Sequence, residues 1–476
     1  MMDEKAPALA ESPLAALRRV FDLQHAASRR EAKPTLDQRL DALARLRGLV
    51  LDNRGAIAQA ISADFGTRSH DETELLEIVP TLNALRHARG HLQAWMKPRR
   101  KNVDIAFQPA KAWVRYEPLG VIGIIAPWNY PLLLTLSPLI DALAAGNRAM
   151  VKPSELTPRF AELLQRLIAK SFAETDVAVV TGGADVAEDF AGLAFDHLVF
   201  TGSTAVGRKV MAAAAQNLTP VTLELGGKSP AIVCADYPIE KAARSIAFGK
   251  FLNAGQTCIA PDYALVPSKS AEAFAQAVLA VARKSYPEIG ANSDYSSVIS
   301  ERHLARLLRA VEEARTAGAR VLSHEDDVGK TRKIGPTVVL NAPATSALMK
   351  EEIFGPVLPV VGYDDLAEAI DFVNARDRPL ALYCFSNDEA QRARVLDGAT
   401  SGGVTLNGTL LHIAQDSLPF GGIGPSGMGA YHGEDGFRRF SHARAVHQIG
   451  AINVFERLGP PWGRLAALVA KFLSRR

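Results

Sequence analysis

Three residues whose side chains could take part in a reaction lie far apart in this chain: a cysteine, a glutamate and an asparagine. Cys258 lies in GQTCIAPDY, among polar and turn-forming residues, and a thiol on such a loop can be reached by a substrate and act as a nucleophile. A buried free cysteine is more often an inert apolar residue. That alternative fits Cys234 and Cys384, which lie within apolar runs. For Cys258, the neighbouring residues alone do not decide between a nucleophile and an inert apolar residue.

The glutamate and the asparagine each have a functional and a structural interpretation. Strand alternation in VTLELGGKSP places Glu224 on the face opposite its two leucine neighbours, and the glycines that follow would let water approach. Such a carboxylate is either a simple strand-end charge or a general base whose pKa burial has raised. Asn129, in PWNYP, is held between two prolines. It is either a turn cap, which is the default, or a preorganised hydrogen-bond donor.

Two further segments have features of a nucleotide site. GSTAVG, with Gly202, Ser203 and Gly207, follows an apolar run and opens a predicted helix, where a phosphate could bind. Its spacing is GxxxxG and not GxGxxG, so the pattern alone is weak. Lys152 and Glu155, in VKPSELTP, follow another predicted strand, where an adenosine ribose lies in a doubly wound sheet. An acid there would bond a ribose 2′-hydroxyl and repel a 2′-phosphate.

The elements that must position these residues follow an α/β pattern. After a helical first hundred residues, short β-branched runs alternate with helical stretches from Trp113, and a second alternating set begins near Ile239. This alternation predicts right-handed crossovers and parallel sheets, so the expected fold class is α/β. Residues 118–140 carry no charge, but three prolines interrupt them, and we expect a buried strand and a buried helix rather than a membrane span.

Composition excludes several other classes of protein. The 476 residues are enough for about three domains. A net charge of +3, without a concentrated basic surplus, argues against a nucleic-acid partner. The three cysteines form no CxxC pair, so we expect neither a metal site nor disulfides. We therefore expect the protein to be located in the reducing cytoplasm. The first residues, MMDEKAPALAESP, do not have the apolar run of a secretory signal.

Taken together, these segments resemble the aldehyde dehydrogenase superfamily. The matching strings are APWNYP, VKPSELTP, FTGSTAVGRKV, VTLELGGKSP, GQTCIAP, EEIFGPV and PFGGIGPSGMG, in the order of the family. GQTCIAPDY and GMGAYHGEDGFRRFSH point to a class-3-like branch. Within it, NGTLLHIAQDSLPFGGIGPSGMG is most similar to bacterial coniferyl aldehyde dehydrogenases.

The resemblance implies a mechanism and a set of site residues. Cys258 would attack the aldehyde to give a thiohemiacetal and then a thioester, Asn129 and the backbone N–H of Cys258 would hold the oxyanion, and Glu224 would activate water. The cofactor implied is NAD, with NADP left open. The resemblance assigns to the cofactor site Trp128, Lys152, Glu155, Gly202, Ser203, Gly207, Leu225, Gly226, Glu352 and Phe354.

The resemblance also implies an organisation. We expect two doubly wound α/β domains, a Rossmann-like cofactor domain and a catalytic domain, plus a small β oligomerisation element that builds a homodimer. The boundaries expected are 1–99 and 119–224 for the dinucleotide-binding domain, 225–435 for the catalytic domain, 100–118 and 436–450 for the oligomerisation segments, and 451–476 for a C-terminal tail.

The expected reaction is the oxidation of a bulky aromatic aldehyde, such as coniferyl aldehyde to ferulate. The alternative is a medium- or long-chain fatty aldehyde, because the tail has a basic amphipathic pattern that could lie on a membrane surface. We favour docking of this tail on the protein. A CoA-acylating enzyme is disfavoured by Glu224, and a catalytically silent protein by the presence of Cys258, Glu224 and Asn129 together.

Overall fold

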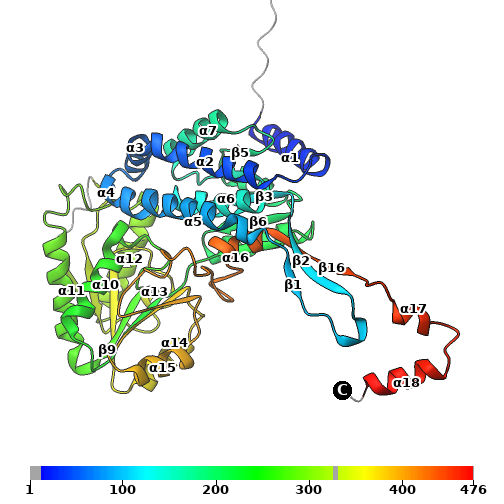
Figure 1. Cartoon of the computed structure of the whole chain (residues 1–476). Helices are drawn as coiled ribbons and strands as arrows, with labels where there is room; N and C mark the ends of the chain where they lie inside the picture. Colours follow the sequence, from blue (N-terminus) through cyan, green and yellow to red (C-terminus); the bar gives the residue numbers. More distant parts are fainter. Residues whose placement is uncertain (1–11, 325–330, 475–476) are drawn as a thin grey trace, which may run out of the picture.

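Two largely parallel sheets organise the chain in the computed structural model, which describes residues 12–324 and 331–474 (Figure 1). The first sheet has six strands, of which five run parallel and the edge strand β15 is antiparallel. In spatial order they are β15 (Gly427–Met428), β7 (Val221–Glu224), β6 (His197–Thr201), β3 (Val121–Ile125), β4 (Arg148–Lys152) and β5 (Val177–Val179).

Helices cover both faces of this sheet. All five residues of β3 are buried, as expected for a central parallel strand. Ile122 and Ile124 join one core cluster, whereas Val121 and Ile125 join another. The helices of this half are α1 (Pro13–Arg30), α2 (Leu36–Asp52), α3 (Arg54–Phe65), α5 (Val79–Trp95), α6 (Leu133–Ala145), α7 (Pro158–Ser171), α8 (Ala184–Ala191) and α9 (Thr204–Ala215).

The second sheet has seven strands, all parallel except the edge strand β10. Its order is β10 (Arg320–Ser323), β11 (Thr337–Leu340), β12 (Val357–Tyr363), β9 (Tyr263–Pro267), β8 (Pro230–Val233), β13 (Ala381–Phe385) and β14 (Gly403–Leu406). The helices of this half are α10 (Ile239–Phe251), α11 (Ala271–Ser285), α12 (Glu301–Thr316), α13 (Ala347–Lys350), α14 (Leu366–Asn374) and α15 (Glu389–Gly398). The predicted α/β fold class is confirmed.

A third sheet forms an arm that projects from the body (Figure 1). It consists of β1 (Arg99–Lys101), β2 (Lys111–Pro118) and β16 (Ser441–Gln448), all antiparallel. Helix α16 (Gly433–Arg439) precedes β16, and α17 (Val454–Leu458) and α18 (Arg464–Leu473) follow it. Leu465 and Leu468 of α18 are each 64% exposed, so this helix does not dock on the described part of its own chain.

One stretch departs from the sequence pattern, and another has the strand and helix that were expected. The helical pattern of the first hundred residues is irregular at one point, where α4 (His70–Thr73) passes into a π-helical turn (Glu74–Ile78) before α5 begins. A π-turn adds a residue to one turn and shifts which side chains face inward. The uncharged stretch 118–140 forms β3 and part of α6, and among the residues that the structure describes no helix is both long and apolar enough to cross a membrane.

Candidate active site

Cys258 lies on the connection between α10 and β9, where the chain turns sharply. Helix α10 ends at Phe251, and Asn253, Ala254 and Gly255 then have positive φ angles of 50°, 49° and 74°. A Cβ at Gly255 would overlap the carbonyl oxygen of Gly355, so only glycine fits this turn. The thiol therefore follows a tightly constrained loop, which fixes its position.

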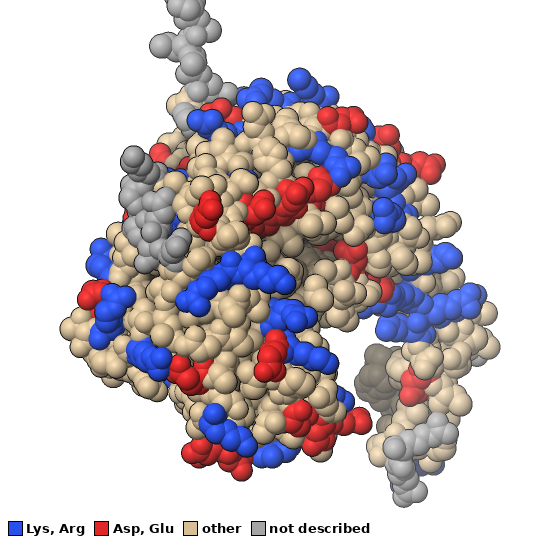
Figure 2. Space-filling view, turned by 90° about the vertical axis from the view of Figure 1, so that its left-hand side faces the viewer, with Lys and Arg blue, Asp and Glu red and all other residues tan. Residues whose placement is uncertain are grey.

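A large cleft of about 1650 Å³ reaches Cys258 from the carboxyl ends of β3, β4, β6 and β7. In Figure 2 the molecule is hollowed at its centre, and Lys and Arg side chains lie along one side of the hollow. The cleft is lined by the three predicted catalytic residues and by nine of the ten predicted cofactor residues: Trp128, Asn129, Lys152, Glu155, Gly202, Ser203, Glu224, Leu225, Gly226, Cys258, Glu352 and Phe354.

Gly207 is the predicted residue that does not line the cleft. It lies in the first turn of α9, and a Cβ there would come within 2.6 Å of Cδ2 of Leu225. The absence of a side chain at Gly207 therefore lets the helix pack closely against Leu225. Through this contact Gly207 helps to position Leu225, which lines the cleft.

Glu224 ends β7 and is only 3% exposed. Neither of its carboxyl oxygens has a hydrogen-bond partner among the described residues. Burial raises the pKa of Glu224 well above its usual value. A carboxyl group held in this way takes up a proton more readily than one in water, which a general base requires.

The Cys258 thiol is half-buried and lines the same cleft. Burial, with the nearby carboxyls of Glu352 and Glu224, raises the pKa of Cys258 to about 12. The backbone N–H groups of Cys258 and Ile259 act in the opposite direction and favour the thiolate. The thiol is therefore protonated at neutral pH, and a base or an added positive charge is needed to form the nucleophile.

Asn129 follows β3 and its side chain crosses to the cysteine loop. Its Nδ2 donates to the carbonyl oxygen of Gln256 at 3.2 Å, and Nδ2 of Asn253 donates to the carbonyl oxygen of Asn129 at 2.9 Å. The side chain is thus a preorganised donor rather than a cap of its own turn. An amide nitrogen carries two hydrogens, so one remains for a second acceptor.

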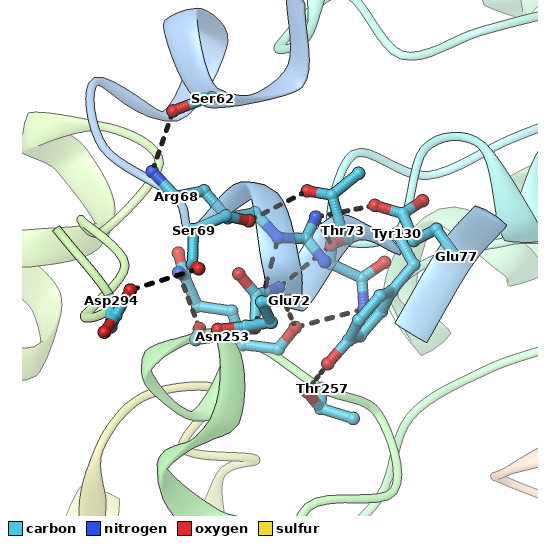
Figure 3. A network of polar contacts seen from close by, with 12 residues as sticks. Ser62, Arg68, Ser69, Glu72, Thr73, Glu77, Tyr130, Asn253, Thr257 and Asp294 are labelled. Atoms are coloured by element: carbon cyan, nitrogen blue, oxygen red, sulfur yellow. Dashed lines mark hydrogen bonds and ion pairs between the residues drawn. The ribbon is translucent and has the colours of Figure 1, made fainter. Parts of the chain in front are cut away.

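A buried polar network holds the backbone of Asn129 and the start of α6 in place (Figure 3). The Arg68 guanidinium is fully buried and donates to Oε1 of Glu77 at 2.7 Å and to the carbonyl oxygen of Asn129 at 3.2 Å. Oε2 of Glu77 accepts from the backbone N–H groups of Leu132 and Leu133, at the start of α6. The hydroxyl groups of Tyr130 and Thr257 lie 2.7 Å apart and join the connection between β3 and α6 to the cysteine loop. These residues were not predicted from the sequence.

The remainder of the cleft has the features that a dinucleotide requires. Ser203 caps α9, which presents its N-terminal N–H groups to the cleft, and such a terminus favours a phosphate. Oε1 of Glu352 is buried and has no hydrogen-bond partner within the described part of the chain, and burial raises the pKa of this residue to about 8. The rings of Trp128 and Phe354 lie 5.3 Å apart. Basic side chains at the rim include Arg208, Lys209, Arg302, Arg306, Arg309 and Arg378.

A second, narrower cavity of about 220 Å³ also reaches the cysteine. Its walls include one face of α5, one face of α6, the cysteine loop and the segment 410–416. Leu134 and Cys258 are the only described residues that line both cavities. The thiol is thus accessible from two separate spaces, one polar and large, the other narrow and mostly apolar.

Comparison with known proteins identifies the family. A family model described as "Aldehyde dehydrogenase family" matches residues 9–446. The chain belongs to the aldehyde dehydrogenase family. A Pseudomonas aeruginosa protein named "Probable coniferyl aldehyde dehydrogenase" is 50% identical over 460 residues, covering 96% of each chain. The coniferyl aldehyde dehydrogenase of a Pseudomonas species is 45% identical over 448 residues, covering 92% of each. The predicted family is confirmed.

Relatives of the enzyme also include solved structures. One described as the substrate-bound state of Staphylococcus aureus AldH superposes with a TM-score of 0.91 at 37% identity, covering 96% of this chain and 99% of that one. Another, 26% identical with a TM-score of 0.84, covers 92% of this chain and 90% of its own and is an NAD⁺ complex of an aldehyde dehydrogenase from Bacillus cereus. The prediction of a nicotinamide cofactor is confirmed at the level of the family.

Proposed function

We propose that the enzyme oxidises an elongated aromatic aldehyde of the coniferyl type to its carboxylic acid. The observation that carries this proposal is the position of Cys258, which lies where the narrow apolar cavity meets the cleft with dinucleotide-binding features. A planar conjugated aldehyde suits a narrow apolar cavity. The names of the relatives point to the same substrate.

In the first step, the Cys258 thiol gives up its proton to a base such as water, the thiolate sulfur attacks the carbonyl carbon, and the carbonyl oxygen takes up the negative charge. Nδ2 of Asn129 and the backbone N–H of Cys258 supply the donors for that oxyanion. Such donors are already oriented and stabilise the charge as it develops. When bound, the oxidised nicotinamide supplies the hydride acceptor, and removal of hydride leaves a thioester on Cys258.

In the second step, Glu224 takes a proton from a water molecule that attacks the thioester. The C–S bond then breaks, Cys258 leaves as a thiolate, and the carboxylic acid departs. The carboxyl oxygens of Glu224 support this role, because neither accepts a hydrogen bond from any residue that the structure describes. The covalent intermediate divides one difficult oxidation into two easier steps.

The cofactor contacts follow from the lining of the cleft. Ser203, Gly202 and the α9 N-terminus would hold the pyrophosphate, and Lys152 and Glu155 the adenosine ribose. Glu352 would hold the nicotinamide ribose, with Phe354, Trp128 and the 225–226 backbone beside the ring. Nζ of Lys152 lies 2.9 Å from Oε2 of Glu155. Although burial opposes it, this hydrogen bond lowers the pKa of Glu155, and a charged carboxylate there favours NAD over NADP.

The organisation predicted from the sequence is retained as part of the proposal. The residue ranges of the cofactor, catalytic and oligomerisation segments stand as given above, with residues 1–11, 325–330 and 475–476 outside the described part. The arm formed by β1, β2 and β16 has exposed edge strands that a second copy could extend, which supports a homodimer. Three free cysteines support a cytoplasmic location. The tail would dock on the partner subunit.

The test is a panel of aldehydes assayed with purified enzyme and both NAD and NADP. We expect coniferyl aldehyde to give a higher kcat/KM than decanal or hexadecanal, with NAD preferred. A clear preference for the aliphatic aldehydes would overturn the aromatic assignment.

A fatty aldehyde is the second candidate, favoured by the exposed leucines of α18. Deleting residues 462–476 separates the two candidates. Loss of long-chain turnover or of liposome binding in the truncated enzyme would support the fatty aldehyde, whereas unchanged kinetics would support the aromatic one.

A further inference from the structure

The narrow cavity has a polar end that the proposed mechanism does not use. Leu134, Ser137 and Asp141 lie on one face of α6 at three- and four-residue steps, and all three line the cavity. Leu134 marks the thiol end of the cavity, because Leu134 and Cys258 are the two described residues that line both cavities. Asp141 is seven residues further along the same helix, which corresponds to about 10 Å at 1.5 Å per residue.

Two further polar residues, from α5 and from the segment 410–416, line the cavity near Asp141. His87 of α5 lines the cavity, as does Asp416 from the opposite wall. Both lie against Gly433, since a Cβ there would overlap the carbonyl oxygen of Asp416 and lie 3.2 Å from Nε2 of His87. Asp141 is joined to the same segment by the backbone N–H of His432, which donates to its Oδ2 at 3.1 Å. The polar groups therefore cluster at the end of the cavity opposite the thiol.

Asp141 is the most deeply placed of these groups, with an exposed fraction of 3%. Oδ2 has the one hydrogen bond described above, and no partner of Oδ1 is found among the described residues. Burial raises the pKa of Asp141 well above its usual value and so favours the neutral carboxyl, which can both donate and accept a hydrogen bond. An apolar chain in the cavity would leave this group unsatisfied, which is unfavourable.

We propose that the Asp141 carboxyl is a specificity-determining group that hydrogen-bonds a hydroxyl at the far end of a rigid, elongated aldehyde. This inference rests on the proposed function and names the part of the substrate that the cavity recognises. In a 4-hydroxycinnamaldehyde the phenolic oxygen is roughly 8 Å from the aldehyde carbon by covalent bond lengths. With a hydrogen bond of about 2.7 Å at its end, such a molecule has a length comparable to the separation of Asp141 from the thiol end of α6. An aldehyde held by both ends would place its carbonyl carbon at Cys258 without further adjustment.

The test compares two aldehydes that differ only by the hydroxyl: coniferyl aldehyde and 3-methoxycinnamaldehyde. We expect the ratio of their kcat/KM values to fall about tenfold from the wild type to Asp141→Ala, as the loss of one hydrogen bond predicts. Because each ratio is measured within a single variant, a change in the amount of folded enzyme does not affect it. Asp435→Asn is the matched control, since Asp435 is a nearby carboxylate that lines neither cavity, and its ratio should equal that of the wild type.

A second measurement needs only the wild type and covers the case in which Asp141→Ala does not fold. Ferulate should inhibit about tenfold more tightly than 3-methoxycinnamate, because it retains the hydroxyl that Asp141 would bind. Equal inhibition by the two acids, or equal substrate ratios in the wild type and Asp141→Ala, would overturn the role of Asp141 while leaving the oxidation of cinnamaldehydes intact. If the wild type oxidised neither cinnamaldehyde, the proposed function itself would be wrong.

Discussion

Replacing Arg68 by methionine tests whether the buried network behind the active site holds it together. The side chains of Arg68 and Glu77 are both fully buried, and methionine fills a similar volume without the charge. Removing one partner of a buried ion pair leaves the other charge unpaired and typically costs about 3–5 kcal/mol. For one domain of 150–250 residues this corresponds to a fall in melting temperature of roughly 6–20 °C.

The assay is thermal unfolding followed by circular dichroism, with Arg54→Met as the control. Arg54 pairs with Glu74 on neighbouring elements, but both side chains are partly exposed, so the control should cost less than about 1 kcal/mol. Glu77→Gln alone should also destabilise, because it leaves the guanidinium without its carboxylate. The double variant should be more stable than the sum of the single effects by about 1–3 kcal/mol, because neither charge is then left unpaired.

Activity provides a second measurement on the same variants. The Arg68 guanidinium also donates to the carbonyl oxygen of Asn129, so its loss should loosen the oxyanion donor and lower kcat more than it raises KM. A melting temperature within 1 °C of the wild type, with unchanged kcat, would refute the view that this network positions the site.

Three further predictions concern single residues. Asn129→Ala should lower kcat on the order of 10²–10³-fold with little change in melting temperature, as measured by steady-state kinetics. Glu224→Gln should retain a burst of NADH but have a slower steady-state rate, because hydrolysis of the thioester is impaired. Since burial raises the pKa of Glu224, the rate of hydrolysis by the wild type should increase with pH as the carboxylate forms, and the variant should lose that pH dependence. Burial raises the pKa of Glu72 from 4.5 to about 7, so the fold favours its neutral form, and the stability that it contributes is present below pH 4.5 and lost as the pH rises through about 7. At pH 8, Glu72→Gln should therefore unfold at a higher temperature than the wild type, because its free energy of unfolding is about 3 kcal/mol larger. At pH 4.5 the two proteins should differ little.

Local patterns in the sequence predicted the elements and the edge of the sheet where polar groups gather. Lys152, Gly202 and Glu224 all lie at or just beyond carboxyl ends of parallel strands, which the α/β alternation was sufficient to predict. The convergence of Cys258 on that edge depended on the family resemblance, because no local pattern reports the sharp turn at 253–255.

The residues that sequence analysis missed act through burial. Arg68 lies in the loop before α4 and Glu77 in the π-turn at 74–78, and both charged side chains are fully buried although nothing in the local sequence marks them as such. Asp141 was hidden in a similar way, as the charge that ends an apolar run. Sequence periodicity does not show which polar side chains are fully enclosed, because that depends on how separate helices pack together.

The two cavities that meet at Cys258 open through different sets of residues, and this has a consequence for the order of events. An acyl group attached to the sulfur would remain on the side of α5 and α6, while the dinucleotide could leave and be exchanged through the cleft at the sheet edge. Turnover then requires no common exit, so neither product has to wait for the other to depart.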